Sequence, residues 1–195
     1  TVIEDSNMTP IDVLSNDTDV DDDDLVLTNI SYTGTSSVEL SSNGLLINYT
    51  PAADFSGSEE IEYTVSDGEL TDTGVLKVTV TPVNDAPVTL NDTLTIEEDS
   101  SLSNKEVILN DTDIDGDSLF VNEISYSGEG TVAISSNSTS IDYTPATNFN
   151  GVEDILYTIS DGELTDTGVL TITVTPVNDA PESNDDTIEL NEGET

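Results

Sequence analysis

Short runs in which hydrophobic and polar residues alternate recur along the whole chain. Ile61, Tyr63 and Val65 form one such run, and Leu76, Val78 and Val80 form another. A period of two places every second side chain on the same face, so each run predicts a β-strand with one buried face. Two further runs of this kind lie in the first half of the chain: Val38 with Leu40, and Leu45 with Ile47 and Tyr49.

The second half of the chain repeats the first without a gap at an offset of 94 residues. This period is about the length of one small sandwich domain, so it predicts tandem whole domains and not a solenoid of short units. We expect a first repeat at residues 1–86, a second at 87–180 and the opening of a third at 181–195. The aligned aromatic and proline residues are Tyr32 with Tyr126, Tyr49 with Tyr143, Phe55 with Phe149, Tyr63 with Tyr157 and Pro82 with Pro176.

The sequence is out of phase with these repeats. Repeat one has no counterpart of residues 87–94, whereas the last residues match that segment, with Thr187-Ile188 aligned to Thr93-Leu94. We therefore expect an excerpt of a longer protein in which repeat one lacks its first strand segment. We also expect residues 181–195 of one copy to complete repeat one of another copy by strand addition.

About seven short strands are expected in each repeat. In repeat two the first is expected at residues 93–96, the second near residues 107–109 and the third from Leu119. This count predicts an all-β fold of two tandem immunoglobulin-like Greek-key sandwiches. Asn43-Gly44 is a hairpin signal in repeat one, and since repeat two has Asn137-Ser138 in its place, we expect that loop to differ.

The chain is strongly acidic, with 42 acidic residues against two lysines and a formal net charge of -40. Nucleic acid and direct membrane insertion are excluded, since the first needs a basic surface and the second a long apolar run. The hydrophobic residues make up 34% of the chain and occur in short alternating runs. A disordered polyanion would lack such runs. With no cysteine, the fold must rely on its core, on metal ions or on neighbouring domains.

Two acidic segments, residues 16–25 and 110–119, carry carboxylates on alternate positions. Such spacing costs repulsion energy unless a cation lies among the side chains. Calcium takes six to eight oxygen ligands, so a short acidic loop supplies several of them at once, and weak sites of this kind suit an extracellular setting. The predicted ligands are Asp17, Asp19, Asp21 and Asp23 in the first segment and Asp111, Asp113, Asp115 and Asp117 in the second.

An EF-hand also opens with Asp-x-Asp-x-Asp-Gly, so this alternative was tested on the twelfth position of each segment. That position is Thr28 in one and Asn122 in the other, where an EF-hand needs a bidentate glutamate. The flanking residues are β-branched and aromatic and show no helical spacing. A calcium loop between strands is the favoured interpretation, and a merely solvated acidic turn is the alternative.

The chain resembles the cadherin-like tandem repeats of large bacterial surface adhesins, including those of the repeats-in-toxin type. The shared features in both repeats are an acidic start as at residues 97–100, the alternating-aspartate loop, Tyr-Thr-Pro followed by Phe and Gly, a Ser-Asp-Gly strand end and a closing Val-Asn-Asp-Ala-Pro. The prolines at both ends of residues 81–87 and 175–181 predict stiff linkers. In animal cadherins the matching parts gather calcium at the junction between consecutive domains.

This resemblance implies a set of calcium ligands at each junction. From repeat one it implies Glu4, Glu59 or Glu60, Asn84 and Asp85, and from repeat two Asp113 and Asp115, with Asp111 and Asp117, and Asp161. The next junction would use Glu98, Glu153 or Asp154, Asn178 and Asp179, and a preceding repeat would meet Asp17, Asp19, Asp21, Asp23 and Asp67. Asp72 and Asp166 stay open between ligand and turn residue. Ala86 and Ala180 stand where animal linkers carry a further acidic or amide residue.

The function implied by the resemblance is that of calcium-rigidified extender repeats of an extracellular bacterial adhesin, bound to their neighbours through the linkers. The alternative is a module that binds carbohydrate or a like repeat on another cell, although few aromatic residues are free for a sugar platform. An enzyme is not expected, because the chain has no histidine or cysteine and its carboxylates cluster in loops that a metal would saturate.

Overall fold

The computed structural model describes residues 1–189 and 192–193. The chain forms two compact units, Thr1–Asp85 and Ala86–Thr195. Of the predicted third repeat, residues 190–191 and 194–195 lie outside the described residues. Residues 181–189 are exposed and belong to no strand.

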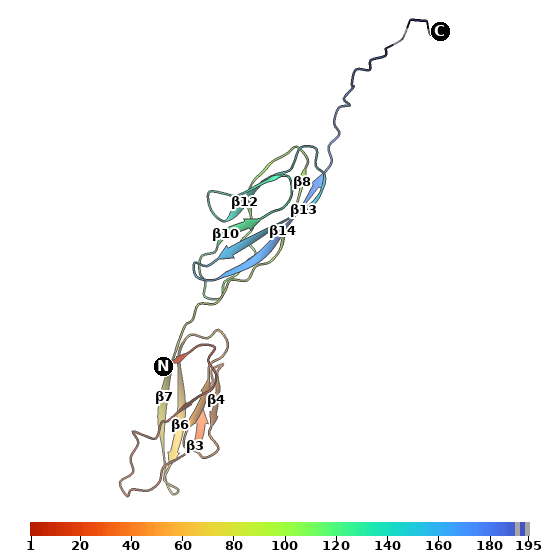
Figure 1. Ribbon diagram of the computed structural model, residues 1–195. Coiled ribbons are helices and arrows are strands. Elements are labelled where there is room, and N and C mark those ends of the chain that lie inside the picture. The colour runs from red at the N-terminus through yellow and green to blue at the C-terminus, as the bar shows by residue number, and fades with distance from the viewer. Residues whose placement is uncertain (190–191, 194–195) are drawn as a thin grey trace. The chain divides into compact units, whose positions relative to one another are not determined.

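Each unit contains seven strands in the described residues, arranged as one four-stranded and one three-stranded sheet (Figure 1). Their orders are β1-β7-β6-β3 and β2-β5-β4 in unit 1, and β8-β14-β13-β10 and β9-β12-β11 in unit 2. The strands of unit 1 are β1 (Val2–Ile3), β2 (Thr9–Ile11), β3 (Val26–Ser31), β4 (Ser37–Leu40), β5 (Ile47–Thr50), β6 (Gly57–Ser66) and β7 (Thr71–Thr81). The strands of unit 2 are β8 (Asp92–Glu97), β9 (Leu102–Glu106), β10 (Phe120–Ser125), β11 (Thr131–Ile134), β12 (Ser140–Thr144), β13 (Gly151–Ser160) and β14 (Thr165–Thr175).

The cores come from the inward faces of these strands. In β6, Ile61 and Tyr63 are buried while Glu60 and Glu62 are exposed, as the alternation of the sequence predicts. Each unit has its own hydrophobic cluster, to which residues of both of its sheets contribute. A fully buried side chain of this size contributes about 1.5–3 kcal/mol of transfer free energy, so the cores account for most of the stabilisation. The predicted all-β fold with two tandem sandwiches is confirmed, and no helix that could cross a membrane occurs in the described residues.

Two predictions about local structure are wrong. The second strand of repeat two lies at Leu102–Glu106 and not near residues 107–109, because this edge strand pairs with β12 through its backbone and has no alternating apolar side chains. The loop at Asn137-Ser138 has the same geometry as Asn43-Gly44, since Ser138 adopts a φ of 58° where Gly44 has 70°. Both turns close with the same backbone hydrogen bond, of 2.9 Å, to a serine carbonyl.

The first strands of the two units differ in length. β8 pairs in parallel with β14 over six residues, whereas β1 pairs with β7 only at Val80 and Thr81. Leu170 of β14 is therefore fully buried, and its counterpart Leu76 of β7 is only half-buried.

Candidate metal centre

The aspartate loop of unit 2 brings three predicted ligands together. One carboxylate oxygen from each of Asp113, Asp115 and Asp117 lies within 4.8 Å of the others. The loop is held by Asp113 Oδ1, which accepts hydrogen bonds from the backbone N–H groups of Asp115 (3.0 Å) and Asp117 (3.1 Å). Gly116 permits the tight reversal because it adopts a φ of 79°. Asp113 Oδ2 is buried and accepts no hydrogen bond within the described part of the chain, as expected of an oxygen that faces a cation.

Asp111, Asp161 and Asp166 have other partners in unit 2. Asp111 Oδ1 accepts from the backbone N–H of Leu90 at 2.8 Å, and burial raises the pKa of Asp111, with smaller contributions from nearby carboxylates. Asp166 Oδ2 accepts from the N–H (2.8 Å) and hydroxyl (2.7 Å) of Thr89, which lower the pKa of Asp166. Asp161 Oδ1 closes the turn after β13 by accepting two backbone N–H groups. Asp166 therefore holds the chain segment that leads into β8, a role that its spacing did not reveal.

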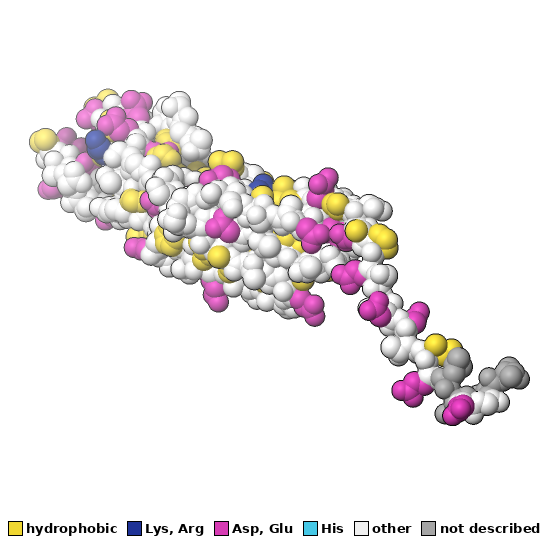
Figure 2. Space-filling view, turned by 90° about the horizontal axis from the view of Figure 1, so that it is seen from above, with side chains coloured by type: hydrophobic (Ala, Val, Ile, Leu, Met, Phe, Trp, Pro, Cys, Tyr) yellow, Lys and Arg dark blue, Asp and Glu magenta, His cyan; other side chains and the backbone are white. Residues whose placement is uncertain are grey.

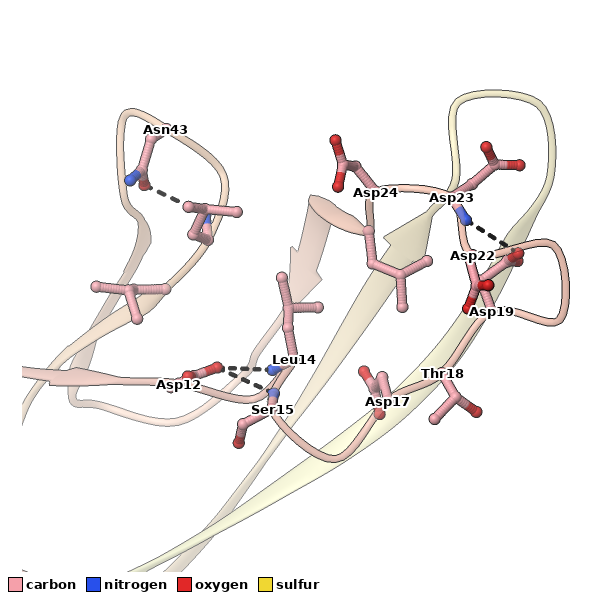
Figure 3. A pocket seen from close by; sticks show the side chains of 13 residues that line it. Asp12, Leu14, Ser15, Asp17, Thr18, Asp19, Asp22, Asp23, Asp24 and Asn43 are labelled. Carbon is pink, nitrogen blue, oxygen red and sulfur yellow. Dashed lines mark hydrogen bonds between the residues drawn. The ribbon is translucent and has the colours of Figure 1, made fainter.

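The matching loop of unit 1 has the same backbone frame. Asp19 Oδ1 accepts from the N–H groups of Asp21 (2.7 Å) and Asp23 (3.4 Å), and Asp22 takes the left-handed place of the glycine with a φ of 61° (Figure 3). An open hollow lies between this loop and the Asn43 turn. Within the described loop, no three of the carboxylates of residues 17–24 approach one another as those of unit 2 do.

Asp17, at the start of this loop, and Asp67, after β6, line a second hollow together. Burial, and then the nearby Asp17 carboxylate, raises the pKa of the Tyr63 hydroxyl. Asp67 Oδ1 accepts from the N–H groups of Leu70 (2.6 Å) and Glu69 (2.7 Å), which lower the pKa of Asp67. Asp72 is exposed at the start of β7.

A second group of carboxylates lies where β7 ends in unit 1. Glu4, immediately after β1, is 3% exposed and accepts a hydrogen bond from the N–H of Val83. One Glu4 carboxylate oxygen lies within 4.8 Å of an Asp85 oxygen, and Asp5, Asp54 and Asp85 form a three-oxygen group within the same limit. Asp5 Oδ1 also accepts from the N–H of Asp54 at 3.1 Å.

Asp5 and Asp54 were missed from the sequence. Both adopt left-handed backbone, with φ of 55° and 56°, and they are 49 residues apart in the sequence. The only sequence signal was the acidic pair Glu4-Asp5, which recurs as Glu98-Asp99. Asn84, the predicted ligand beside Asp85, donates from Nδ2 to the Asp85 carbonyl at 3.3 Å.

The corresponding end of unit 2 keeps this frame with one carboxylate fewer. Glu98 is 5% exposed and accepts from the N–H of Val177 (2.6 Å) and from Asn150 Nδ2 (3.3 Å). Asp99 Oδ1 accepts from the N–H of Asn148 at 3.3 Å, the position that Asp54 holds in unit 1. Asn178 Nδ2 donates to the carbonyl of Asp179, whose side chain is exposed.

Glu59 and Glu153, which the resemblance also implied as ligands, are bound by tyrosines. Glu59 accepts the hydroxyl of Tyr32 on Oε1 and that of Tyr49 on Oε2 (2.5 Å). Burial by itself raises the pKa of Glu59, but the tyrosine hydroxyls outweigh it and hold that pKa below its usual value. Glu153 is bound by the two corresponding tyrosines, but through one oxygen, since its Oε2 accepts from both Tyr126 (2.6 Å) and Tyr143. Glu60 and Asp154, next to them, are exposed.

The electrostatics favour a hard cation at the carboxylate groups. Negative side chains are spread over the visible face in Figure 2, and only two basic side chains occur in the chain. Among the described residues the one ion pair is Lys105 with Asp92, at 3.4 Å. With neither histidine nor cysteine in the sequence, the available ligands are oxygens, which suit calcium better than zinc or copper.

Comparison with known proteins agrees with this fold. Human protocadherin-24 EC1-2 aligns with a TM-score of 0.53 and 17% identity over 84% of this chain and 85% of that chain. The protocadherin gammaB7 EC3-6 cis-dimer aligns with a TM-score of 0.54 and 14% identity over 89% of this chain and 47% of that chain. At these identities the likeness concerns the fold alone.

Other comparisons add less. The endo-fucoidan hydrolase MfFcnA4 from glycoside hydrolase family 107 aligns with 20% identity over 91% of this chain, but the TM-score is 0.39 and the chain spans only 27% of that enzyme. A search of curated protein sequences gave no match.

The family assignment comes from the sequence itself. The sequence model of the family described as "Bacterial Ig domain" matches residues 1–79 and again residues 84–173, so that each unit has one match. These two matches cover most of the chain and coincide with two sandwiches of the same topology. The chain therefore belongs to the bacterial Ig domain family.

Proposed function

We propose that this chain is a calcium-binding spacer of an extracellular bacterial protein, in which calcium at the ends of successive Ig-like units stiffens the array and carries an adhesive region away from the cell. The main observation in support is the group of Asp113, Asp115 and Asp117. In this group the buried Asp113 Oδ2 lacks a hydrogen-bond partner in the described structure. The group would hold calcium through carboxylate oxygens, and the ion would supply the positive charge that offsets their repulsion.

The carboxylate group at the end of β7 in unit 1 supports the proposal that calcium stiffens the array. Asp5, Asp54 and Asp85, with buried Glu4, gather at the residue where unit 1 ends and Ala86 begins unit 2. A buried carboxylate that has no cation nearby costs several kcal/mol, so Glu4 favours a bound ion at this place. Within unit 2, the aspartate loop is joined to the residue that directly follows the linker, because Thr112 and Val88 exchange two backbone hydrogen bonds of 2.8 and 3.1 Å.

A structural role fits the remaining features of the chain. The largest fully buried side chains are Tyr49, Tyr143 and Tyr157, so these tyrosines pack the cores and are not available as a sugar platform. The resemblance to cadherin-like adhesin repeats points the same way. We propose no catalytic reaction for this chain.

The experiment that tests the proposal is calcium titration by calorimetry together with thermal melting in calcium, magnesium and chelator. Calcium at about one hundred times its Kd should add roughly 2.7 kcal/mol to the stability of the unit that binds it. Magnesium should add less, because it requires strict octahedral geometry and retains its waters.

Two variants make the result specific. Asp113→Ala should abolish one class of calcium site, whereas Glu62→Gln, which removes one exposed charge from the surface of β6, should leave calcium binding unchanged. Identical melting of the unmodified chain in calcium and in chelator would rule out the proposal.

A further inference from the structure

Unit 2 has a lysine at a position that is apolar in unit 1. Lys105 lies on the edge strand β9 and aligns at the 94-residue offset with Ile11, which packs against the core of unit 1. Lysine seldom occupies a partly buried position unless another group is paired with it. Here that group is Asp92, the first residue of β8, whose Oδ1 lies 3.4 Å from Lys105 Nζ.

The fold holds this pair together and shields it from water. The side chains of Lys105 and Asp92 are only 25% and 12% exposed. Lys105 lies opposite Ile141 in the ladder of β9 with β12, and Asp92 lies opposite Leu170 in the ladder of β8 with β14. Both backbones are therefore fixed before the side chains meet, so the entropy of bringing an amine to a carboxyl group is already spent on folding.

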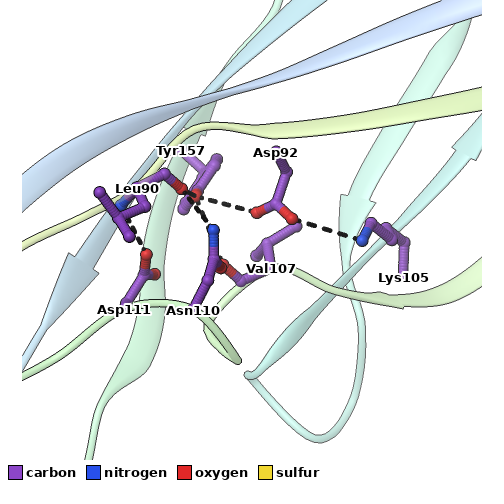
Figure 4. A network of polar contacts seen from close by, with 7 residues as sticks. All are labelled: Leu90, Asp92, Lys105, Val107, Asn110, Asp111 and Tyr157. Atoms are coloured by element: carbon purple, nitrogen blue, oxygen red, sulfur yellow. Dashed lines mark hydrogen bonds and ion pairs between the residues drawn. The ribbon is translucent and has the colours of Figure 1, made fainter.

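The second oxygen of Asp92 has a donor that is fixed in the core. The hydroxyl of the fully buried Tyr157 donates to Asp92 Oδ2 at 3.2 Å, and it also lies near the carbonyls of Leu90 (3.1 Å) and Val107 (3.3 Å). The Asp92 carboxylate lies between the Tyr157 hydroxyl and Lys105 Nζ (Figure 4). One oxygen thus faces an amine, and the other faces a donor that can stabilise negative charge.

We propose that Lys105 Nζ and Asp92 Cγ condense spontaneously to a side-chain amide, an isopeptide bond within unit 2. A proton first moves from the ammonium group to Asp92 Oδ1, which leaves a neutral amine and a neutral carboxyl group. The Nζ lone pair then attacks Cγ, the electron pair of the carbonyl moves onto Oδ2, and the Tyr157 hydroxyl stabilises the charge there.

The step balances without any further reactant. A second proton moves from Nζ to Oδ1, the Cγ–Oδ1 bond breaks, and the carbonyl forms again at Oδ2. One ammonium and one carboxylate therefore give one amide and one water molecule. The shielded position favours this outcome, because an ion pair that is removed from water loses hydration, whereas a neutral amide does not have that cost.

The bond would join the two sheets of unit 2. β8 belongs to the four-stranded sheet and β9 to the three-stranded sheet, so the amide closes a ring through residues 92–105 and across the sandwich. β8 is the strand that follows the linker, and its ladder with β14 consists of backbone hydrogen bonds alone. The chain has no cysteine for a disulfide at this place. The proposal goes beyond calcium binding, since the bond requires no ion.

The test is the intact mass of the purified whole chain by mass spectrometry. The expected mass is one water molecule below the mass that the sequence gives. After proteolysis, fragmentation should find one branched peptide in which the segment of Asp92 is joined to the segment of Lys105. Asp92→Asn should expel ammonia in place of water, and because the product is the same amide, its final mass should equal that of the natural cross-linked chain.

Two arginine variants make the result specific. Lys105→Arg keeps a positive charge beside Asp92 but has no nucleophilic amine, so this variant should show its full mass. Lys77→Arg changes the exposed lysine of unit 1 and should still lose one water molecule. A full mass for the natural chain, or a loss of water that Lys105→Arg retains, would overturn the proposal.

Discussion

Replacement of Glu59 by glutamine tests whether this carboxylate serves in a hydrogen-bond network or as a calcium ligand. Glu153 is its counterpart in the second repeat. Both Glu59 oxygens accept tyrosine hydroxyls, from Tyr32 and Tyr49, and Tyr49 also lies 3.1 Å from the hydroxyl of Ser36. Ser36 Oγ in turn accepts the N–H of Ala52, so the network ties the loop after β3 to the loop after β5. Glu59→Gln keeps one acceptor oxygen and turns an amide NH₂ toward the other hydroxyl.

The expected cost follows from these bonds. At least one charge-assisted hydrogen bond is lost, worth about 1.5–3 kcal/mol. For a domain of this size each kcal/mol corresponds to about 4–8 °C, so the melting temperature of unit 1 should fall by roughly 10 °C. We expect the same fall in calcium and in chelator, since the tyrosines already occupy both carboxylate oxygens.

Calorimetric melting of the whole chain is the assay, and unit 2 serves as the internal reference. Glu59→Gln should lower one transition. Glu153→Gln should lower the other by less, because both tyrosines donate to Glu153 Oε2 and the amide oxygen of glutamine can accept both bonds. An unchanged melting temperature would refute the structural role of the network. A fall seen only in calcium would instead make Glu59 a metal ligand, as the cadherin resemblance implies.

Three further predictions use the match between the units. Ser138→Gly should raise the stability of unit 2 in denaturant unfolding, whereas Gly44→Ser should lower that of unit 1 by about 1 kcal/mol, since both positions have positive φ and a Cβ at Gly44 would lie 3.2 Å from a backbone oxygen. Burial, and then the bond to Glu59, raises the pKa of Tyr49 from 10.0 to about 12. The stability that the protonated Tyr49 hydroxyl contributes should therefore be intact below pH 10 and lost as the pH rises through about 12, which alkaline unfolding curves would show. Leu170→Ala should cost about 2–5 kcal/mol in the same unfolding assay and Leu76→Ala clearly less, because only Leu170 is fully covered.

The sequence predicted the parts of the fold that depend on side-chain burial. The alternation at Ile61 and Tyr63 identified β6 because every second residue enters the core. Leu102–Glu106 gave no such signal, since this edge strand is held by backbone pairing with β12 and most of its side chains are polar. Ser138 was misjudged because a serine can adopt left-handed backbone when the surrounding turn fixes it.

The candidate site was predicted less completely than the fold. Alternate aspartates identified Asp113 and its neighbours because a single short loop contains all of them. Asp5 and Asp54 were missed because they are far apart in the sequence and meet through two left-handed turns. The tyrosine partners of Glu59 come from the loop after β3 and from β5, so no local pattern could show that its oxygens are occupied.

The most direct test of the central claim is small-angle scattering of the chain in saturating calcium and in chelator, together with the variants Asp113→Ala and Asp19→Ala. If calcium stiffens the array, the maximum dimension should fall and the scattering become that of a bent ensemble when calcium is removed, because a small unclamped interdomain contact is mobile. Asp113→Ala should show the same change in saturating calcium. Asp19→Ala should not, because its loop lies near the start of β7, at the opposite end of that strand from the linker to unit 2. Scattering that is identical in calcium and chelator, or equal shortening in both variants, would contradict the account.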